Sequence, residues 1–514
     1  MRLTAVTKES ICVSFSYDQS IVEQIKRIPG ARYRRIEKTW VVPVSEDAYA
    51  VLRNFTTDLS LFVSLHEFLR QPVSDTLIGY RWKMKPFLHQ QEGTSLLVKS
   101  RCFALHDEMG LGKSKTVIDA IGALYDAGDI TGVIVVCPLG VIDVWEEQIA
   151  LHGVTPPTIW TLINYEKVRC LRHRTPLLDK IKTGKVVVVL DEGHRIKSPR
   201  TLQTRGCIEL GVRAAYRWLL TGTPIAKDVL DLWAQFAFLD KRILGSPSYT
   251  AFKHKYAVMG GYCVDHRPVQ IIGWKHTDEI TKKIARFSRR ALKADCLDLP
   301  EKLFTTRSVP MTAAQFKHYK EIKTLLVTKT DKTLVMTPNA LTKALRLSQI
   351  TSGHLPETTL DNPKLDMLRT LIEEHEGSYI VYCRFIPELQ RILDILPPDT
   401  ATIHGAIKPT QRTIAERDFQ SGVSRGIVLQ IATGGIGLTL TQASMVVYMS
   451  NTYSWVDRAQ SMDRPHRPGL THPVLYVDVL ATTPTGKETI DHGVLKISNA
   501  KKNLAEVTLG DIIL

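Results

Sequence analysis

The chain has 514 residues, of which 44% are hydrophobic, so it carries enough apolar side chains for roughly three domains of typical size. No apolar run is long enough to span a membrane, and the N-terminus lacks the apolar segment of a signal peptide. The formal net charge of +15 favours a polyanionic partner such as nucleic acid, with charge that only serves solubility as the alternative.

The first part of the chain alternates between strand-like and helix-like patterns. Residues 11–17 alternate apolar and polar side chains like a half-buried strand, and residues 39–44 resemble them. Residues 20–28 place isoleucines at helical spacing and are followed by a Pro-Gly stop. Residues 1–75 are therefore predicted to form a small α+β domain, and the more polar residues 71–80 are a predicted linker.

Near-continuous apolar runs that end in loops begin after residue 83. Residues 133–138, 186–190 and 217–224 are runs of this kind, which is typical of strands buried on both faces of a parallel sheet. A less regular, helix-rich stretch is expected over residues 240–300. A second strand-helix series then follows, with strands predicted at 378–383, 401–405, 426–432, 445–450 and 474–480. The predicted class is α/β, with domains at 1–75, 76–300 and 301–514.

The sequence DEMGLGKS, residues 107–114, has the composition of a phosphate-binding loop. Gly110 and Gly112 allow the backbone to approach phosphates closely. Lys113 is expected to neutralise the terminal phosphates, and the hydroxyl of Ser114 to bind Mg²⁺. Asp107 stands where the general pattern has its first glycine. The alternative is a glycine-rich turn with a surface lysine.

The sequence DEGH follows the apolar run VVVVL directly. Asp191 and Glu192 are thereby placed at the carboxyl edge of a sheet, where ligands bind in open α/β folds. Asp191 is expected to hold Mg²⁺, and Glu192 to orient and deprotonate the attacking water. The alternative, a solvated acidic pair, is disfavoured by the four valines and by the phosphate loop upstream.

The sequence QSMDRPHRPG supplies the counterpart from the second strand-helix series. Arg464 and Arg467 are three residues apart and share one face of a helix. Because guanidinium groups are planar and always charged, both are expected to complete the nucleotide site from the domain predicted at residues 301–514, exposed in a cleft opposite Lys113 and Asp191. A solvated basic helix is the alternative.

Together these residues resemble the Swi/Snf-like ATPases of helicase superfamily two, from about residue 83 to the C-terminus. The resemblance implies two RecA-like lobes and a catalytic role for Gln460. It implies that Gln90 reads adenine and that Asp107 belongs to the phosphate loop. In motif V, IATGGIGLTLTQA, it implies nucleotide contacts from Gly435 and Gly437.

The same resemblance implies a DNA track and a link between the lobes. CPLGVIDVWEEQ resembles motif Ia, and RRALKADCLDLPEK resembles the segment that joins the lobes. Thr221 in LTGTPI, which resembles motif III, and Thr433 in motif V are expected to contact DNA. Three positions depart from the family pattern and lie outside the expected phosphate-handling residues: Lys227, Thr439 and Leu470.

Residues 15–44 resemble the HARP module of annealing helicases. A basic group there is expected to contact DNA phosphates, with a solvated loop as the alternative: Arg32, Arg34, Arg35 and Lys38. Trp40 is interpreted as a core residue rather than a base-stacking one. His194 and His466 are expected to form hydrogen bonds that couple the lobes and not to bind metal.

A second basic cluster has two interpretations, a DNA-tracking surface or a solvated helix face that anchors a lobe: Lys282, Lys283, Arg286, Arg289, Arg290 and Lys293.

The resemblance implies a monomeric, double-stranded DNA-stimulated ATPase that uses ATP and Mg²⁺. Strand annealing, branch migration or remodelling of forked or branched DNA is the expected activity. The alternatives are an ATP-driven remover of DNA-bound proteins and a DNA-binding module with weak ATPase activity. The eight cysteines are scattered without a C-x-x-C pair, which argues against zinc and disulfides. An intracellular protein is expected, from a bacterial or phage-infected cytoplasm or a nucleus.

Overall fold

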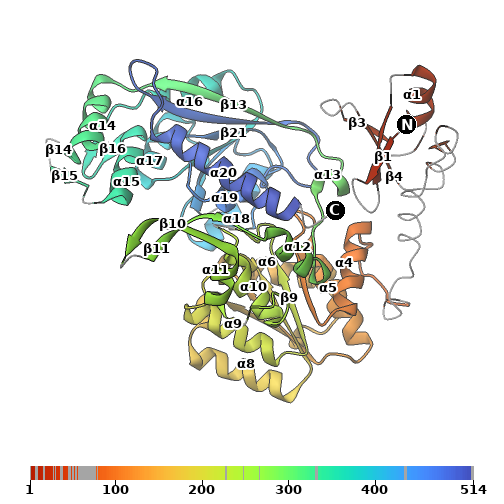
Figure 1. Cartoon of the computed structure of the whole chain (residues 1–514). Helices are drawn as coiled ribbons and strands as arrows, with labels where there is room; N and C mark the ends of the chain where they lie inside the picture. The colour runs from red at the N-terminus through yellow and green to blue at the C-terminus, as the bar shows by residue number, and fades with distance from the viewer. Residues whose placement is uncertain are drawn as a thin grey trace.

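A computed structural model describes the chain apart from residues 1, 6–9, 16–17, 27, 29–30, 35–38, 44–47, 49–50, 53–54, 56–76, 78, 226–227, 247, 265–266, 330–333, 338, 433–436 and 511–514. Three sheets of four or more strands organise the described residues. Figure 1 shows two of them at the centres of two lobes that face each other, with the N-terminal sheet beside them.

The N-terminal sheet is antiparallel, with the strand order β1-β2-β4-β3. Its elements are β1 (Arg2–Ala5), β2 (Ser10–Ser14), α1 (Gln19–Lys26), β3 (Arg32–Arg34) and β4 (Thr39–Pro43). Val13, Ile25 and Trp40 pack in its small core. The predicted strands and helix are confirmed within a few residues, and so is the interpretation of Trp40 as a core residue.

The sheet of lobe 1 is parallel throughout, with the order β12-β5-β9-β8-β6-β7. Its strands are β5 (Cys102–Leu105), β6 (Gly132–Cys137), β7 (Trp160–Asn164), β8 (Val186–Asp191), β9 (Tyr216–Leu220) and β12 (Ser288–Arg289). Alternate residues of β8 enter two separate cores, with Val187 and Val189 on one face and Val188 on the other. This arrangement explains the run of four valines, because both faces of the strand are buried.

Helices cover both faces of this sheet. They are α4 (Leu88–Lys99), α5 (Lys113–Asp126), α6 (Ile142–His152), α7 (Tyr165–Val168), α8 (Leu171–Thr183), α9 (Leu202–Arg213), α10 (Asp231–Asp240), α11 (Tyr249–Tyr256) and α12 (Thr277–Ile284). The stretch expected to be helix-rich also contains an antiparallel hairpin, β10 (Ala257–Val264) with β11 (Arg267–Trp274). The prediction missed this hairpin because glycines and register shifts interrupt its alternation.

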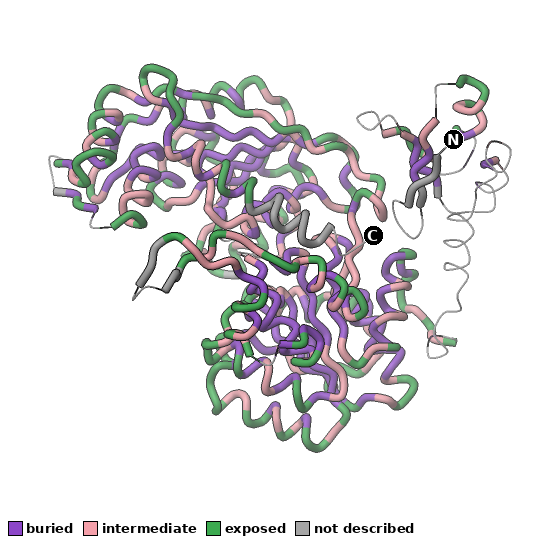
Figure 2. Tube along the Cα trace, viewed as in Figure 1, coloured by how far each residue is buried: buried purple, intermediate pink, exposed green. Residues whose placement is uncertain are grey.

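The sheet of lobe 2 is also parallel, with the order β13-β22-β21-β18-β20-β19. Its strands are β13 (Lys302–Pro310), β18 (Ser378–Cys383), β19 (Ala401–Ile403), β20 (Gly426–Gln430), β21 (Ala443–Tyr448) and β22 (Val474–Thr482). Figure 2 shows buried residues concentrated along the strands inside both lobes. The five strands predicted after residue 378 are all present.

The helices that pack on this sheet are α16 (Lys364–Glu373), α17 (Ile386–Ile395), α18 (Pro409–Gln420), α19 (Trp455–Met462) and α20 (Ile490–Gly510). A further layer has its own core and was not predicted: α14 (Ala313–Leu325), β14 (Val327–Lys329), β15 (Leu334–Met336), α15 (Ala340–Thr351), β16 (His354–Leu355) and β17 (Thr358–Thr359). The short helix α13 (Lys293–Cys296) lies on the connection between the lobes (Figure 1). Within the described residues, no helix combines the length and apolarity needed to cross a bilayer.

Candidate active site between the lobes

The phosphate loop, residues 107–114, lies between β5 and the start of α5. Gly110 and Gly112 have φ angles of 82° and 78°, in the left-handed region that glycine tolerates best. Gly112 is the N-cap of α5, and no side chain caps this helix. The N–H groups of its first turn are therefore available to phosphate oxygens, as an anion site requires.

Two side chains donate hydrogen bonds to the backbone of this loop. The Nζ of Lys113 donates to two backbone carbonyls of the loop, at 2.7 and 3.1 Å. Gln90 on α4 is buried; its Nε2 donates to the carbonyl of Leu111 at 3.2 Å, and its Oε1 accepts from the N–H of Phe87 at 3.1 Å. Gln90 thus braces the phosphate loop, and its contact with adenine stays a prediction.

Asp107, expected among the nucleotide-binding residues, instead uses its carboxylate within the protein. Its Oδ1 accepts from the N–H of Ala291 at 2.8 Å, and its Oδ2 accepts from the Nη2 of Arg289 at 3.2 Å. The residue is 1% exposed. This use of the carboxylate depends on tertiary structure, since both partners lie more than 180 residues away in the sequence and hold the interlobe connection against the loop. A nucleotide contact of Asp107 stays a prediction.

Asp191 ends β8 and is held from two directions. Its Oδ2 accepts from the indole Nε1 of Trp145 at 2.8 Å, and its Oδ1 accepts from the N–H of Glu192 at 3.0 Å. The hydroxyl of Tyr165 donates to its backbone carbonyl at 2.7 Å. Burial, followed by the neighbouring charge of Glu192, raises the pKa of Asp191 to about 6. A bound cation would offset the free-energy cost of burying the ionised carboxylate of Asp191.

Glu192 has a left-handed backbone with φ 52° and ψ 51°, a conformation that costs energy for a residue with a side chain. Its Oε2 lies 3.2 Å from the Nδ1 of His194, and its Oε1 accepts from the Nε2 of Gln460 at 3.3 Å. Burial raises the pKa of Glu192, but the hydrogen bond and charge of His194, together with nearby cations, lower it below its ordinary value. The ionised carboxylate is the form that accepts a proton.

Thr221, expected to contact DNA, is fully buried just after β9. Its Oγ1 lies 3.1 Å from the Nδ1 of His194 and accepts from the N–H of Thr223 at 3.2 Å. The prediction of a DNA contact is therefore wrong, because the hydroxyl is used inside the sheet. The predicted hydrogen bonding of His194 is confirmed, but Thr221 and Glu192 both contact its Nδ1 from lobe 1, so these contacts do not themselves couple the lobes.

The arginine loop, residues 463–467, follows α19 and reaches the phosphate loop. Gln460 on α19 makes the hydrogen bond to Glu192, which crosses from lobe 2 to lobe 1. A Cβ atom placed on Gly110 would lie 3.6 Å from the Cγ of Arg467. Three separate sequence motifs thus meet at one place, as expected.

The two arginines differ from the prediction in their exposure. Arg464 is only 6% exposed, and its Nη1 lies 3.5 Å from the carbonyl of Leu438. The Nη1 of Arg467 donates to the Oγ1 of Thr439 at 3.1 Å, so this departure from the family pattern supplies an arginine partner. Burial and then Arg464 lower the pKa of Arg467 to about 10, which leaves it charged at neutral pH. The expectation that both are exposed is wrong, because Arg464 is buried and Arg467 is half-buried among residues of lobe 2.

Motif V also faces lobe 1. A Cβ atom on Gly437 would lie 3.2 Å from the Cγ2 of Val144 on α6. The expected nucleotide contact of Gly435 and the expected DNA contact of Thr433 lie outside the described residues.

The donors at this site fit a magnesium nucleotide. Mg²⁺ prefers hard oxygen ligands, and Ser114 and Asp191 supply a hydroxyl and a carboxylate. The Oδ2 of Asp191 accepts a hydrogen bond from Trp145 and its Oδ1 accepts one from the N–H of Glu192, and a carboxylate oxygen has a further lone pair for a cation or its water. The uncapped α5 and the cations Lys113, Arg464 and Arg467 match phosphate charge. Among the described residues, no group of three His, Cys, Asp or Glu forms a separate metal site.

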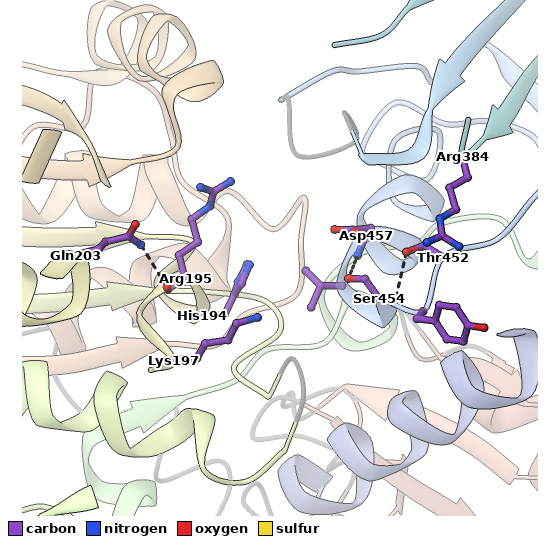
Figure 3. A pocket seen from close by; sticks show the side chains of 10 residues that line it. His194, Arg195, Lys197, Gln203, Arg384, Thr452, Ser454 and Asp457 are labelled. Atoms are coloured by element: carbon purple, nitrogen blue, oxygen red, sulfur yellow. Dashed lines mark hydrogen bonds between the residues drawn. The ribbon is translucent and has the colours of Figure 1, made fainter. Parts of the chain in front are cut away.

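A cavity of about 590 Å³ opens between the lobes next to this site (Figure 3). His194, Arg195 and Lys197 line it from lobe 1, while Arg384 and Asp457 line it from lobe 2. The guanidinium of Arg384 lies over the rings of Phe385 and Tyr453, at 5.1 and 5.8 Å from their centroids. Three cationic side chains with one carboxylate make this space attractive to an anion, and aromatic rings beside it are typical of single-strand binding surfaces.

The N-terminal arginines meet carboxylates near the interlobe connection. Arg32 lies 3.4 Å from Asp298 and Arg34 lies 3.9 Å from Asp295, both as ion pairs. Burial raises the pKa of Asp295 to about 6 against the lowering effect of Arg34. The other two expected phosphate contacts, Arg35 and Lys38, lie outside the described residues.

The second basic cluster, residues 282–293, is interpreted from the sequence either as a DNA-tracking surface or as a solvated helix face. Neither interpretation applies to all of its residues. Arg289 and Lys293 are nearly buried and bind residues of the phosphate and arginine loops. Lys282 and Arg286 are exposed. Trp145 and Lys293 could not be identified as site residues from the sequence, because neither residue type indicates a role until its distant partner, Asp191 or Asp463, is known.

Geometrically, the chain is a two-lobed α/β protein whose lobes share a candidate nucleotide site. The model of the SNF2-related domain matches residues 89–168 and 161–353, and the model of the helicase conserved C-terminal domain matches residues 363–469. Since the first of these alone covers about half of the chain, the chain belongs to the SNF2-related domain family.

Three similar proteins illustrate the spread of this family. The zebrafish chromodomain-helicase-DNA-binding protein 1-like is 23% identical over 79% of this chain and 42% of its own length. A Caenorhabditis elegans homologue of the SWI/SNF-related matrix-associated actin-dependent regulator of chromatin subfamily A-like protein 1 is 23% identical over 93% of this chain and 72% of its own length. The solved Sulfolobus solfataricus SWI2/SNF2 ATPase core in complex with dsDNA is 24% identical, with a TM-score of 0.39, over 86% of this chain and 96% of its own.

The chain spans less than half the length of several curated relatives that it matches. The assignment to the family rests on the family models.

Proposed function

We propose that this chain is an ATP-driven translocase on double-stranded DNA that acts in strand annealing, branch migration or fork remodelling. The observation that carries the ATPase part is the hydrogen bond between Gln460 and Glu192. This bond places the arginine-bearing motif of lobe 2 against the carboxylate that follows the lobe 1 sheet. A site divided between two lobes can convert hydrolysis into relative motion of the lobes.

Each residue of the site has a defined task in this proposal. The N-terminus of α5 and Lys113 bind the phosphates, and Glu192 orients a water and accepts its proton. Arg464 and Arg467 stabilise charge that develops on the transferred phosphoryl group. Mg²⁺, bound by Ser114 and Asp191, would neutralise phosphate charge.

The charge of the chain and the interlobe cavity support a nucleic-acid partner. The chain carries a formal net charge of +15. Arg195 and Lys197 of lobe 1 and Arg384 of lobe 2 line one cavity (Figure 3), so a single phosphodiester backbone that enters it would contact both lobes. Relative motion of the lobes would then move the bound strand.

The annealing and fork-remodelling role rests on the HARP-like N-terminal domain. A match over 93% of this chain must include part of residues 1–75, so the nematode relative shares more than the two lobes. The lobes grip a backbone without regard to branching. Junction preference therefore has to come from an added surface, and we assign it to residues 1–75.

We expect removal of the N-terminal basic group to reduce activity on forks more than on plain duplex. The variant carries alanine at Arg32, Arg34, Arg35 and Lys38. Fork binding measured over a range of salt should lose about one unit of slope per phosphate contact removed. ATPase rates on single-stranded, duplex and forked DNA, followed by an annealing assay, complete the measurement.

A matched control removes four exposed basic residues of lobe 1: Arg172, Lys182, Lys185 and Arg213. The control should bind forks and duplex with an unchanged ratio. A second control, Asp295→Ala with Asp298→Ala, frees Arg32 and Arg34 from their carboxylates and should strengthen fork binding. If the four-residue N-terminal variant prefers forks as strongly as the unaltered chain, the domain is structural and the annealing role is withdrawn.

A second candidate function is ATP-driven removal of proteins bound to DNA. The names of other relatives favour it, among them TATA-binding protein-associated factor MOT1 of Saccharomyces cerevisiae, 23% identical over 82% of this chain. Displacement of a protein roadblock from plain duplex, without fork preference, would select this function. A DNA-binding module with weak ATPase activity would show neither displacement nor annealing.

A further inference from the structure

The connection between the lobes runs beside the phosphate loop before it enters lobe 2. β12 pairs in parallel with β5, and the N–H of Glu108 donates to the carbonyl of Ala291 at 2.9 Å. The carboxylate of Glu108 in turn accepts from the N–H of Lys293 at 2.7 Å. This path places the start of α13 against the phosphate loop.

Lys293 extends from this point to the arginine loop. Its Nζ donates to the Oδ1 of Asp463 at 2.9 Å and to the carbonyl of His466 at 2.8 Å. Its Cε lies 3.3 Å from the position of a Cβ atom on Gly110. A single side chain therefore touches the phosphate loop and holds both ends of the segment that carries Arg464.

Lys302 provides a comparison within the same chain. Its Nζ also donates to the Oδ1 of Asp463 at 2.9 Å, but its side chain is 26% exposed, against 7% for Lys293. No contact of Lys302 with the phosphate loop or with the carbonyl of His466 is found among the described residues. Asp463 therefore keeps a cationic partner when Lys293 is replaced. The replacement consequently tests the position of the arginine loop more than the loss of a charge beside Asp463.

We propose that Lys293 is a positioning residue that fixes the distance between the arginine loop and the phosphate loop. A shift of the arginines by about 1 Å is enough to lower the rate of a chemical step by orders of magnitude. The inference rests on the proposed ATP hydrolysis, in which Arg464 and Arg467 act on the transferred phosphoryl group. It assigns a role in that reaction to a residue of the interlobe connection.

The pH dependence of turnover supplies a readout that a purely structural role would not change. Burial lowers the pKa of Lys293 to about 8. The charge of Lys302 also lowers this pKa, whereas the charges of Asp463 and Glu108 raise it. Arg467 is a further cation near Lys293, because the side chains of both residues approach Gly110. The protonated form, present below the pKa, donates to Asp463 and to the carbonyl of His466, so kcat should fall as pH rises through about 8.

The test compares Lys293→Met with Lys302→Met in the full-length chain. Steady-state ATP hydrolysis with duplex DNA should show kcat lowered by about 10- to 100-fold for Lys293→Met, with KM for ATP within about twofold. Lys302→Met should stay within about twofold of the unaltered chain in both constants. The alkaline decline of kcat near pH 8 should be absent from Lys293→Met and retained in Lys302→Met.

Two further variants separate the possible failures. Lys293→Gln keeps an N–H donor and replaces Lys293→Met if the latter melts at a lower temperature. Lys113→Ala reports on the site itself: an unaltered chain that hydrolyses ATP no faster than Lys113→Ala contradicts the proposed function. If hydrolysis depends on Lys113 but Lys293→Met and Lys293→Gln keep an unchanged kcat, or lose no more than Lys302→Met, only the role of Lys293 is refuted.

Discussion

Replacing Glu192 by glutamine is expected to lower the rate of ATP hydrolysis by about 10³-fold while ATP and DNA binding persist. The amide keeps the size of the side chain and can still contact His194 and Gln460, but it cannot accept a proton from water. Phosphate binding depends on the loop at residues 107–114, which the substitution does not touch. Single-turnover hydrolysis, together with binding of a fluorescent ATP analogue, measures the two effects separately.

The control for this variant is Glu373→Gln, an exposed glutamate on α16 in lobe 2. It should hydrolyse ATP at the rate of the unaltered chain. Turnover of Glu192→Gln close to that rate would remove Glu192 from the role of general base. Loss of nucleotide binding together with turnover would instead mean that Glu192 holds the site in shape.

Arg464→Gln and Arg467→Gln are each expected to lower kcat by about 10³-fold or more, because an arginine finger stabilises charge formed only in the transition state. Glutamine is chosen in place of alanine because Arg464 is buried and a shorter apolar residue would leave a cavity. KM for ATP should change little. Steady-state kinetics and melting temperature give the measurement.

Arg417→Gln is the matched control, since Arg417 is an exposed arginine on α18 that pairs with its neighbour Asp418. It should leave kcat unaltered. If Arg464→Gln and Arg467→Gln both retained kcat within about threefold, the transition-state role of the arginine loop would be disproved.

Local patterns in the sequence predicted most of the two sheets. Four consecutive valines in a strand are typical of a sheet whose two faces are both buried. The side chains of β8 accordingly enter both cores of lobe 1. Elements with weaker patterns were missed. The hairpin of β10 and β11 contains three glycines and register shifts that break its alternation. The layer formed by α14 and α15 depends on its own core, which only the folded chain reveals.

The candidate site was predicted in its centre and not in its surroundings. Asp191, Glu192 and Gln460 meet as expected, because glycine loops and strand ends have strong local signals. The burial of Thr221 and Lys293 had no such signal. A lysine is normally exposed, and the buried ammonium of Lys293 is paired with Asp463, 170 residues further along the chain. Tertiary pairing of this kind cannot be read from composition or periodicity.

The central claim is that a site divided between two lobes couples ATP hydrolysis to duplex DNA. The most direct measurement is phosphate release by the full-length chain with ATP and Mg²⁺, in the presence and absence of duplex DNA, with Glu192→Gln as the reference. The account predicts slow release without DNA, severalfold faster release with DNA, and none above background from Glu192→Gln in either condition. Release that is absent, or that is equally fast with and without DNA, would contradict it.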